Sequence, residues 1–253
     1  MKIEIAGLPV EWQTENTEFI SGFASQSGEP PVMTIGFDAK MPECHGIAYS
    51  PKLSAHVLRN ESGEILCADE EWKNVTAYYT QERGDYALPL AAMCSRFAAF
   101  NTLLFHASCV ELNGKSVIFT GNSGVGKTTQ AKLWQKHLGA EIINGDKIFV
   151  REINGFYACG LAWKGSSEFC LNRKASLAGI IVLRQAKENR LTLLGDSAAQ
   201  KLLPHVFLPH WDSRCLDSAL NTFEKIIGNV PVYLLECRPD EAAVRLVYET
   251  LPD

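Results

Sequence analysis

The chain has 253 residues, 46% of them hydrophobic, which suits one large globular domain or a small domain joined to a larger one. Its formal net charge of −5 argues against nucleic acid as a partner, and no apolar stretch is long enough to span a bilayer. The acidic Glu4 lies where an export signal would be apolar, so we expect a cytoplasmic protein. The eight cysteines form no C-x-x-C pair, which fits small core residues in a reducing compartment.

Residues 1–86 predict a β-rich region without a long helix. Short alternating or β-branched runs, separated by Gly and Pro, are typical of strands that turn often. We find no catalytic constellation here, and we interpret His45 and His56 as ordinary surface or hydrogen-bonded histidines. The predicted strands cover residues 2–5, 32–37, 56–59, 64–68 and 75–80.

Residues 87–253 predict an α/β domain, so we divide the chain at residue 86. Apolar residues predict one buried helix over 88–104 and a strand over 106–112. Asn113-Gly114 is a strong hairpin signal that joins this strand to the next one. The strands expected after it cover 115–120, 140–144, 148–152, 156–159, 178–183 and 232–237, and the helices cover 127–138, 196–203, 215–228 and 240–251.

The sequence Gly-Asn-Ser-Gly-Val-Gly-Lys-Thr-Thr follows the predicted strand 115–120 and opens the predicted helix 127–138. It matches the phosphate-binding pattern G-x-x-x-x-G-K-[ST] in full, and the strand, glycine-rich turn and helix are the context that such a loop requires. Backbone N–H groups and the helix dipole would hold a polyphosphate there. The predicted nucleotide-binding residues are Gly121, Asn122, Ser123, Gly124, Val125, Gly126, Lys127, Thr128 and Thr129.

Two polar side chains of the loop have expected roles. Lys127 would reach the β- and γ-phosphates, and the Thr128 hydroxyl would ligate Mg²⁺. We therefore expect the chain to bind ATP or GTP with Mg²⁺. No guanine-reading Asn-Lys-x-Asp segment is present.

Two further residues fall near the loop. Asp146 ends the strand 140–144, where it would hold Mg²⁺ or accept the proton of an attacking hydroxyl; the competing interpretation is an ordinary turn aspartate. Antiparallel pairing through the hairpin would set His106 beside Thr120 and Gly121, next to the phosphates. A core histidine bonded to backbone is the alternative.

For three other parts of the sequence, a role in the site and an ordinary structural role both fit the pattern. Arg184 ends the strand 178–183 and would supply a cation to the transferring phosphate, or else be solvated. The glycine-bracketed segment 160–168 would close over the acceptor or the γ-phosphate, or form a surface loop. We also consider residues 209–212, which are polar and aromatic, as a possible wall of the site.

Phe105-His106-Ala107, the loop 121–129 and Asn144-Gly145-Asp146 resemble the catalytic core of the HPr kinase/phosphorylases. Those enzymes phosphorylate a serine on a carrier protein and are related in fold to the ATP-using phosphoenolpyruvate carboxykinases. The resemblance covers roughly residues 100–185. The chain resembles even more closely the HPr-kinase-like proteins encoded beside peptide-modification genes, some of which phosphorylate serine in a peptide precursor. The resemblance implies a phosphate-loop α/β domain of this type, ATP and Mg²⁺ as ligands, and a tendency to form homo-oligomers.

One difference from the family affects the chemistry. The family usually has two adjacent aspartates after the loop helix, whereas this chain reads Gly145-Asp146-Lys147. Either Gly145 replaces the first aspartate or Lys147 replaces the second. One carboxylate then serves both the metal and the nucleophile, or one of these roles is absent.

We expect an ATP-dependent kinase that phosphorylates a hydroxyl, with a serine of a peptide or small protein as the acceptor. Its catalytic residues would be His106, Lys127, Asp146 and Arg184, and its metal ligands Thr128 and Asp146. A kinase for a small metabolite is one alternative. A nucleotide-responsive binding protein with little catalysis is the other, favoured by the single aspartate.

Overall fold

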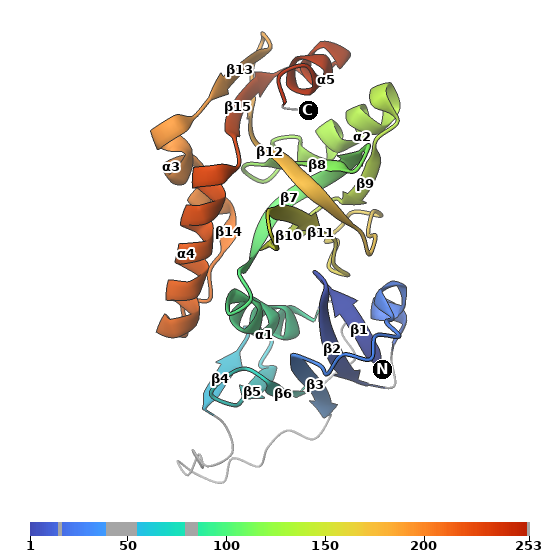
Figure 1. The fold of residues 1–253 in the computed structure, drawn as a ribbon, viewed down its shortest axis with the longest axis vertical. Coiled ribbons are helices and arrows are strands. Elements are labelled where there is room, and N and C mark those ends of the chain that lie inside the picture. The colour runs from blue at the N-terminus through green and yellow to red at the C-terminus, as the bar shows by residue number, and fades with distance from the viewer. Residues whose placement is uncertain (15–16, 39–54, 79–85, 252–253) are drawn as a thin grey trace.

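The computed structural model describes residues 1–14, 17–38, 55–78 and 86–251, and it builds them into two β-sheets with α-helices (Figure 1). The first half of the chain forms a six-stranded sheet and the second half a nine-stranded one. His45 lies outside the described residues. None of the helices in these ranges is both long and apolar enough to cross a membrane.

The first sheet has the strand order β1-β2-β3-β6-β5-β4, and β2–β3 and β3–β6 are its parallel pairs. Its strands are β1 (Lys2–Ile5), β2 (Leu8–Gln13), β3 (Met33–Asp38), β4 (His56–Arg59), β5 (Ile65–Ala68) and β6 (Asn74–Tyr78), with a 3-10 helix at Glu18–Phe23. The sequence predicted all of these strands except β2. Buried and partly exposed residues do alternate along β2. The pattern predicts no strand there because Pro9 interrupts the run, and proline is rare in strand interiors.

The helix predicted over 88–104 is wrong at its end. α1 covers Ala87–Ala98, and Leu103 and Leu104 belong to β7 (Thr102–Leu112). The chain turns at Asn101, whose φ of 49° lies in the left-handed region that asparagine tolerates well. β7 is buried on both faces, and an apolar run without period two cannot be told from a buried helix by its pattern.

The second sheet has the order β11-β10-β7-β8-β12-β15-β13, and β9 and β14 also pair with β7. The β8–β12 and β12–β15 pairs are parallel, so these three strands end at the same edge of the sheet. The sequence did not predict β13 or β14. The strands are β8 (Lys115–Thr120), β9 (Glu141–Asn144), β10 (Lys147–Glu152), β11 (Phe156–Cys159), β12 (Lys174–Gln185), β13 (Arg190–Leu193), β14 (Val206–Phe207) and β15 (Val232–Cys237).

Helices cover both faces of the second sheet (Figure 1). Phe119 and Ile181 pack with α2 (Lys127–Leu138) and α5 (Glu241–Tyr248). Ile118 and Ile180, one residue earlier in the same strands, pack on the opposite face with α3 (Ala198–Leu202) and α4 (Ser213–Asn229). The period of two in β8 and β12 therefore produces a three-layer α/β arrangement.

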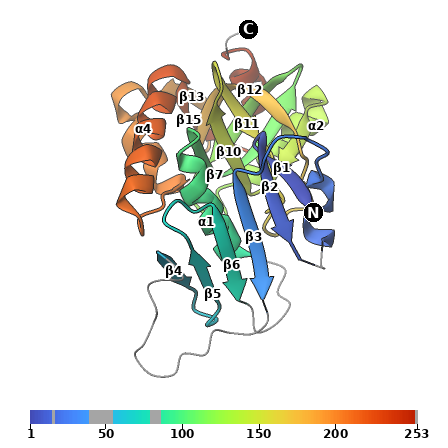
Figure 2. The same cartoon turned by 60° about the horizontal axis from the view of Figure 1, so that its bottom comes forward.

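The two halves share a core. α1 lies between the first sheet and the start of β7 (Figures 1 and 2), and its buried residues join one apolar cluster with β1, β2 and β3. A buried polar link reinforces this junction at Asp212, the N-cap of α4. Its carboxylate accepts from the backbone of Arg214 at 3.0 Å and from Trp72 Nε1 at 3.0 Å, and it lies 3.3 Å from His56 Nε2. The loop 209–212 is thus a structural junction, with Trp211 Nε1 donating to Ser95 Oγ.

Asp212→Ala should destabilise the fold strongly. The change removes a helix cap and leaves the indole N–H of Trp72 buried without its acceptor, so we expect a loss of about 2–4 kcal/mol in the free energy of unfolding. Asp240→Ala is the matched control, because Asp240 caps α5 but is not buried at a domain junction; about 1 kcal/mol is expected. Urea denaturation measures both, and equal losses would contradict the role given to the Trp72 contact.

Candidate functional site

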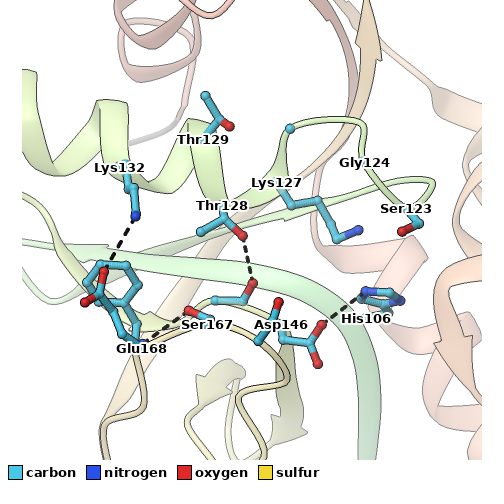
Figure 3. A pocket seen from close by; sticks show the side chains of 14 residues that line it. His106, Ser123, Gly124, Lys127, Thr128, Thr129, Lys132, Asp146, Ser167 and Glu168 are labelled. Carbon is cyan, nitrogen blue, oxygen red and sulfur yellow. Dashed lines mark hydrogen bonds and ion pairs between the residues drawn. The ribbon is translucent and has the colours of Figure 1, made fainter.

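The loop 121–126 connects β8 to α2 at the edge of the sheet where the parallel strands end. Gly126 is the N-cap of α2 with φ 113°, a backbone conformation that side chains disfavour, so glycine permits the turn into the helix. A cavity of about 670 Å³ opens beside this helix end (Figure 3). Its wall consists of His106, Ser123, Gly124, Gly126, Lys127, Thr128, Thr129, Lys132, Gly145, Asp146, Ser166, Ser167, Glu168 and Phe169.

Lys127 lies on the rim of this cavity with 9% of its surface exposed. Its ammonium donates to the carbonyl oxygens of Gly121 at 3.1 Å and Asn122 at 3.3 Å, so the side chain is folded back along the loop (Figure 3). Burial lowers the pKa of Lys127, and the nearby charge of Asp146 opposes that shift. The lysine is therefore held where a phosphate bound to the loop would meet it.

Asp146 faces the loop from the turn between β9 and β10. The turn is held by Asn144, which is fully buried and accepts from the backbone N–H groups of Asp146 at 2.9 Å and Lys147 at 3.0 Å. The amide of Asn144 donates in turn to the carbonyls of Leu161 and Trp163. The sequence analysis named Asn144 only as part of a motif and missed this positioning role. An asparagine before a turn glycine is a usable signal for it, because Asn side chains commonly hydrogen-bond the backbone of the turn that follows.

His106 contacts Asp146 across the mouth of the site. In the β7–β10 pairing His106 lies opposite Lys147, and its Nε2 is 3.4 Å from Asp146 Oδ1 (Figure 3). The hydrogen bond from His106 holds the pKa of the Asp146 carboxyl well below its usual range, and an ion pair with Lys147 adds to this effect against the opposing cost of burial. Asp146 is consequently an ionised acceptor.

The residues present fit Mg²⁺. The Thr128 hydroxyl donates to the Gly145 carbonyl at 3.2 Å, which sets it beside the turn that bears Asp146. Within the described ranges no group of three or more acidic, histidine or cysteine side chains forms a complete metal cage. Mg²⁺ commonly uses one or two carboxylates together with substrate phosphates, so one hydroxyl and one carboxylate are a sufficient protein contribution.

The segment 160–169 closes the other side of the cavity and divides into two parts. Ser166, Ser167 and Glu168 line the cavity. Trp163 is instead buried, with Nε1 donating to the Tyr86 carbonyl at 3.1 Å, so the aromatic residue belongs to the core of the first half. We call residues 164–169 the strap, because Glu168 also forms an ion pair with Lys132 of α2 at 3.6 Å.

The strap touches the acidic turn so closely that residue 145 has no room for a side chain. A Cβ on Gly145 would overlap Ser167 Oγ and lie 2.5 Å from Ser167 Cβ. A Cβ on Gly165 would lie 2.6 Å from the Asp146 carboxylate. Ser167 therefore occupies the place that a side chain at 145 would fill, a contact between distant segments that sequence patterns do not reveal.

The structure does not bring every predicted residue to the cavity. Arg184 is not part of its described wall, and its guanidinium forms an ion pair with Glu236 of β15. The role of Arg184 stays a prediction. The sequence did not suggest His205. Burial lowers the pKa of this histidine, and the nearby charges of Lys127 and His106 lower it further.

Comparisons with known proteins give little further information. No family model matches the sequence, and no curated protein matches it. Among solved structures, the HPr(Ser) kinase/phosphatase from Coxiella burnetii is similar with a TM-score of 0.33 and 13% identity, over 58% of this chain and 96% of that one.

Gly145→Ala should lower stability, because the new methyl group overlaps Ser167. We expect a loss of about 1–3 kcal/mol in the free energy of unfolding, as is usual for overpacking. Adding Ser167→Gly should restore most of it by vacating the space. The control is Gly228→Ala in α4, where nothing lies within 4 Å; there a gain of up to about 1 kcal/mol is expected. A Gly145→Ala protein with wild-type stability would refute the packing.

Metal-free protein should show an Asp146 carboxyl that titrates below its ordinary pKa of 3.8, and His106→Ala should raise that pKa. Since the folded pKa is the lower one, the linked stability is present above pH 3.8 and lost as the pH falls below it. Carbon-13 NMR of the side-chain carboxyl measures both proteins. An unchanged Asp146 pKa in the variant would contradict the His106 hydrogen bond.

Proposed function

We propose that this protein is an ATP-dependent kinase that transfers the γ-phosphate to a hydroxyl group, with a serine of a peptide or small protein as the acceptor. One observation carries the proposal. The phosphate loop, with its rim lysine Lys127, faces the hydrogen-bonded pair His106 and Asp146 across a single cavity. A cradle for a polyphosphate and a carboxylate that can meet a nucleophile are the parts that phosphoryl transfer requires.

Each residue has a defined task in this mechanism. The backbone N–H groups of the loop and the Lys127 ammonium bind the β- and γ-phosphates. Thr128 and Asp146 would hold Mg²⁺, which supplies positive charge against the phosphate oxygens when bound. Most of the rate enhancement would come from this positioning and charge stabilisation, because the protein itself makes no covalent bond.

The transfer itself exchanges one P–O bond for another. The acceptor oxygen bonds to the γ-phosphorus, the bond from that phosphorus to the β–γ bridging oxygen breaks, and ADP leaves. The Asp146 carboxylate is positioned to accept the hydrogen bond of the acceptor hydroxyl and to orient it. The hydroxyl proton passes to the Asp146 carboxylate, which the hydrogen bond from His106 holds in place.

The proposed acceptor is a serine in a peptide or small protein. The resemblance over residues 100–185 favours a serine in a peptide, and a cytoplasmic location would supply ATP. The seven cysteines in the described ranges are all free, in keeping with a reducing compartment. A small metabolite with a free hydroxyl is the alternative substrate, and it would take label in the absence of any peptide.

A nucleotide-responsive binding protein is the second candidate. The observation that favours it is the ion pair between Asp146 and Lys147, since a carboxylate engaged by a lysine is less available to metal or acceptor. The other carboxylate on the described wall of the cavity, Glu168, is paired with Lys132. This candidate predicts nucleotide binding without transfer.

Lys127→Met should slow the phosphoryl transfer strongly. Incubation with γ-labelled ATP, Mg²⁺ and a pool of serine-containing peptides should label a peptide with the wild-type protein, and the variant should be at least about 100-fold slower, because a preorganised charge at the reacting phosphate is lost. Lys225→Met is the control; it removes a lysine from the surface of α4 that is paired with Glu152, and its rate should be that of wild type. Wild-type protein that binds ATP but labels neither peptide nor metabolite would favour the binding protein instead.

A further inference from the structure

A second cavity lies on the other side of the phosphate loop. Its volume is about 390 Å³, within the range of ordinary small-molecule sites. It shares Gly124, Gly126 and Thr129 with the first cavity, so the start of α2 separates the two spaces. Its described wall consists of Gly124, Val125, Gly126, Thr129, Gln130, Leu183, Gln185, Ala186, Cys237, Arg238 and Pro239.

This cavity sits at the carboxyl ends of two parallel strands. β12 and β15 pair in parallel up to Gln185 opposite Cys237, and the chain continues from these ends into Ala186 and Arg238, which line the cavity. In α/β sheets, ligands bind in the crevice outside the carboxyl ends of the strands. The cavity therefore lies where α/β sheets commonly place their ligands.

If a nucleotide binds as proposed, the two cavities set its direction. Lys127, Asp146 and His106 all lie on the first cavity, so the reacting end of the triphosphate belongs there. The nucleoside end of the nucleotide would then leave the loop past one of the residues that line both cavities. Thr129, directly after the metal-binding Thr128, is such a residue, and beyond it lies the second cavity.

We infer that the second cavity holds the base and ribose of the nucleotide, and that the base is adenine. This inference rests on the proposed nucleotide function and adds the residues that read the nucleoside. The walls suit a flat ring: Val125, Leu183, Ala186 and Pro239 supply apolar surface. Gln185 adds a polar edge and also donates to the carbonyls of Gly124 and Val125 at 3.4 Å, which ties this wall to the phosphate loop.

Two features of the wall favour adenine over guanine. Guanine presents adjacent N–H donors that a carboxylate would pair with, and the described wall contains no Asp or Glu. Gln130 is 3% exposed, its amide nitrogen donates to Cys237 Sγ at 3.3 Å, and its Oε1 has no hydrogen-bond partner among the described residues. The exocyclic amine of adenine is a donor that would complete the hydrogen bonding of this acceptor, whereas the O6 atom of guanine is another acceptor.

Ala186→Trp tests the location, because it fills the cavity with an indole and leaves the phosphate loop intact. Calorimetry in Mg²⁺ compares ATP with inorganic tripolyphosphate, which has no base. The variant should bind ATP at least about 10-fold more weakly than wild type and bind tripolyphosphate unchanged, since only the buried apolar surface of the nucleoside is lost. Ala178→Trp is the matched control: Ala178 lies on β12 beside a different cavity, and both ligands should bind this variant as they bind wild type.

Unchanged ATP affinity in Ala186→Trp, with tripolyphosphate still bound, would overturn the inference while leaving the kinase proposal standing. The opposite failure is also visible. If Ala186→Trp weakens ATP alone but the wild-type protein transfers no label, the nucleoside subsite stands and the kinase proposal fails.

Base selectivity is tested separately. Wild-type protein should bind ATP more tightly than GTP, and Gln130→Met, which keeps the length of the side chain but removes the acceptor, should reduce that preference. Equal affinities for ATP and GTP in the wild-type protein would overturn the assignment of adenine.

Discussion

The register of β7 is the constraint on which the site depends. This strand pairs with β8 so that Ala107 lies opposite Thr120, and with β10 so that His106 lies opposite Lys147. β8 leads into the glycine-rich loop 121–126, and β10 begins at the acidic turn. A slip of one residue in either pairing would turn His106 to the other face of the sheet, away from the loop.

Side-chain hydrogen bonds hold this register where the backbone ladder ends. The Thr120 hydroxyl donates to the His106 carbonyl at 2.8 Å, and the Ser108 hydroxyl donates to the Lys127 carbonyl at 2.8 Å. The second bond joins β7 to the first turn of α2, and Ser108 is fully buried. The first half of the chain contributes at a distance: Tyr86 anchors Trp163, whose carbonyl receives the amide of Asn144, and Asn144 shapes the acidic turn. The aromatic core of the β-rich half thus supports the strap and the turn from behind.

Local patterns predicted the parts of this arrangement that are local. The turn of the glycine-rich loop, the helix after it and the Asn113-Gly114 hairpin depend on glycine conformations and short-range periodicity, and hairpin pairing alone placed His106 beside Thr120. The end of α1 was missed because a strand buried on both faces has no period of two. Non-local contacts were also beyond prediction, such as Ser167 against Gly145 or the pairing of Arg184 with Glu236, because each depends on how separate segments pack and not on spacing along the chain.

The packing around the acidic turn shows what glycine at 145 and lysine at 147 each do in this chain. Ser167 fills the space at 145, so a carboxylate there would require the strap to move. Lys147 pairs with Asp146 and balances the one carboxylate that remains. The turn therefore presents one carboxylate balanced by one ammonium, and the contact between the strap and residue 145 leaves no space for a second carboxylate there.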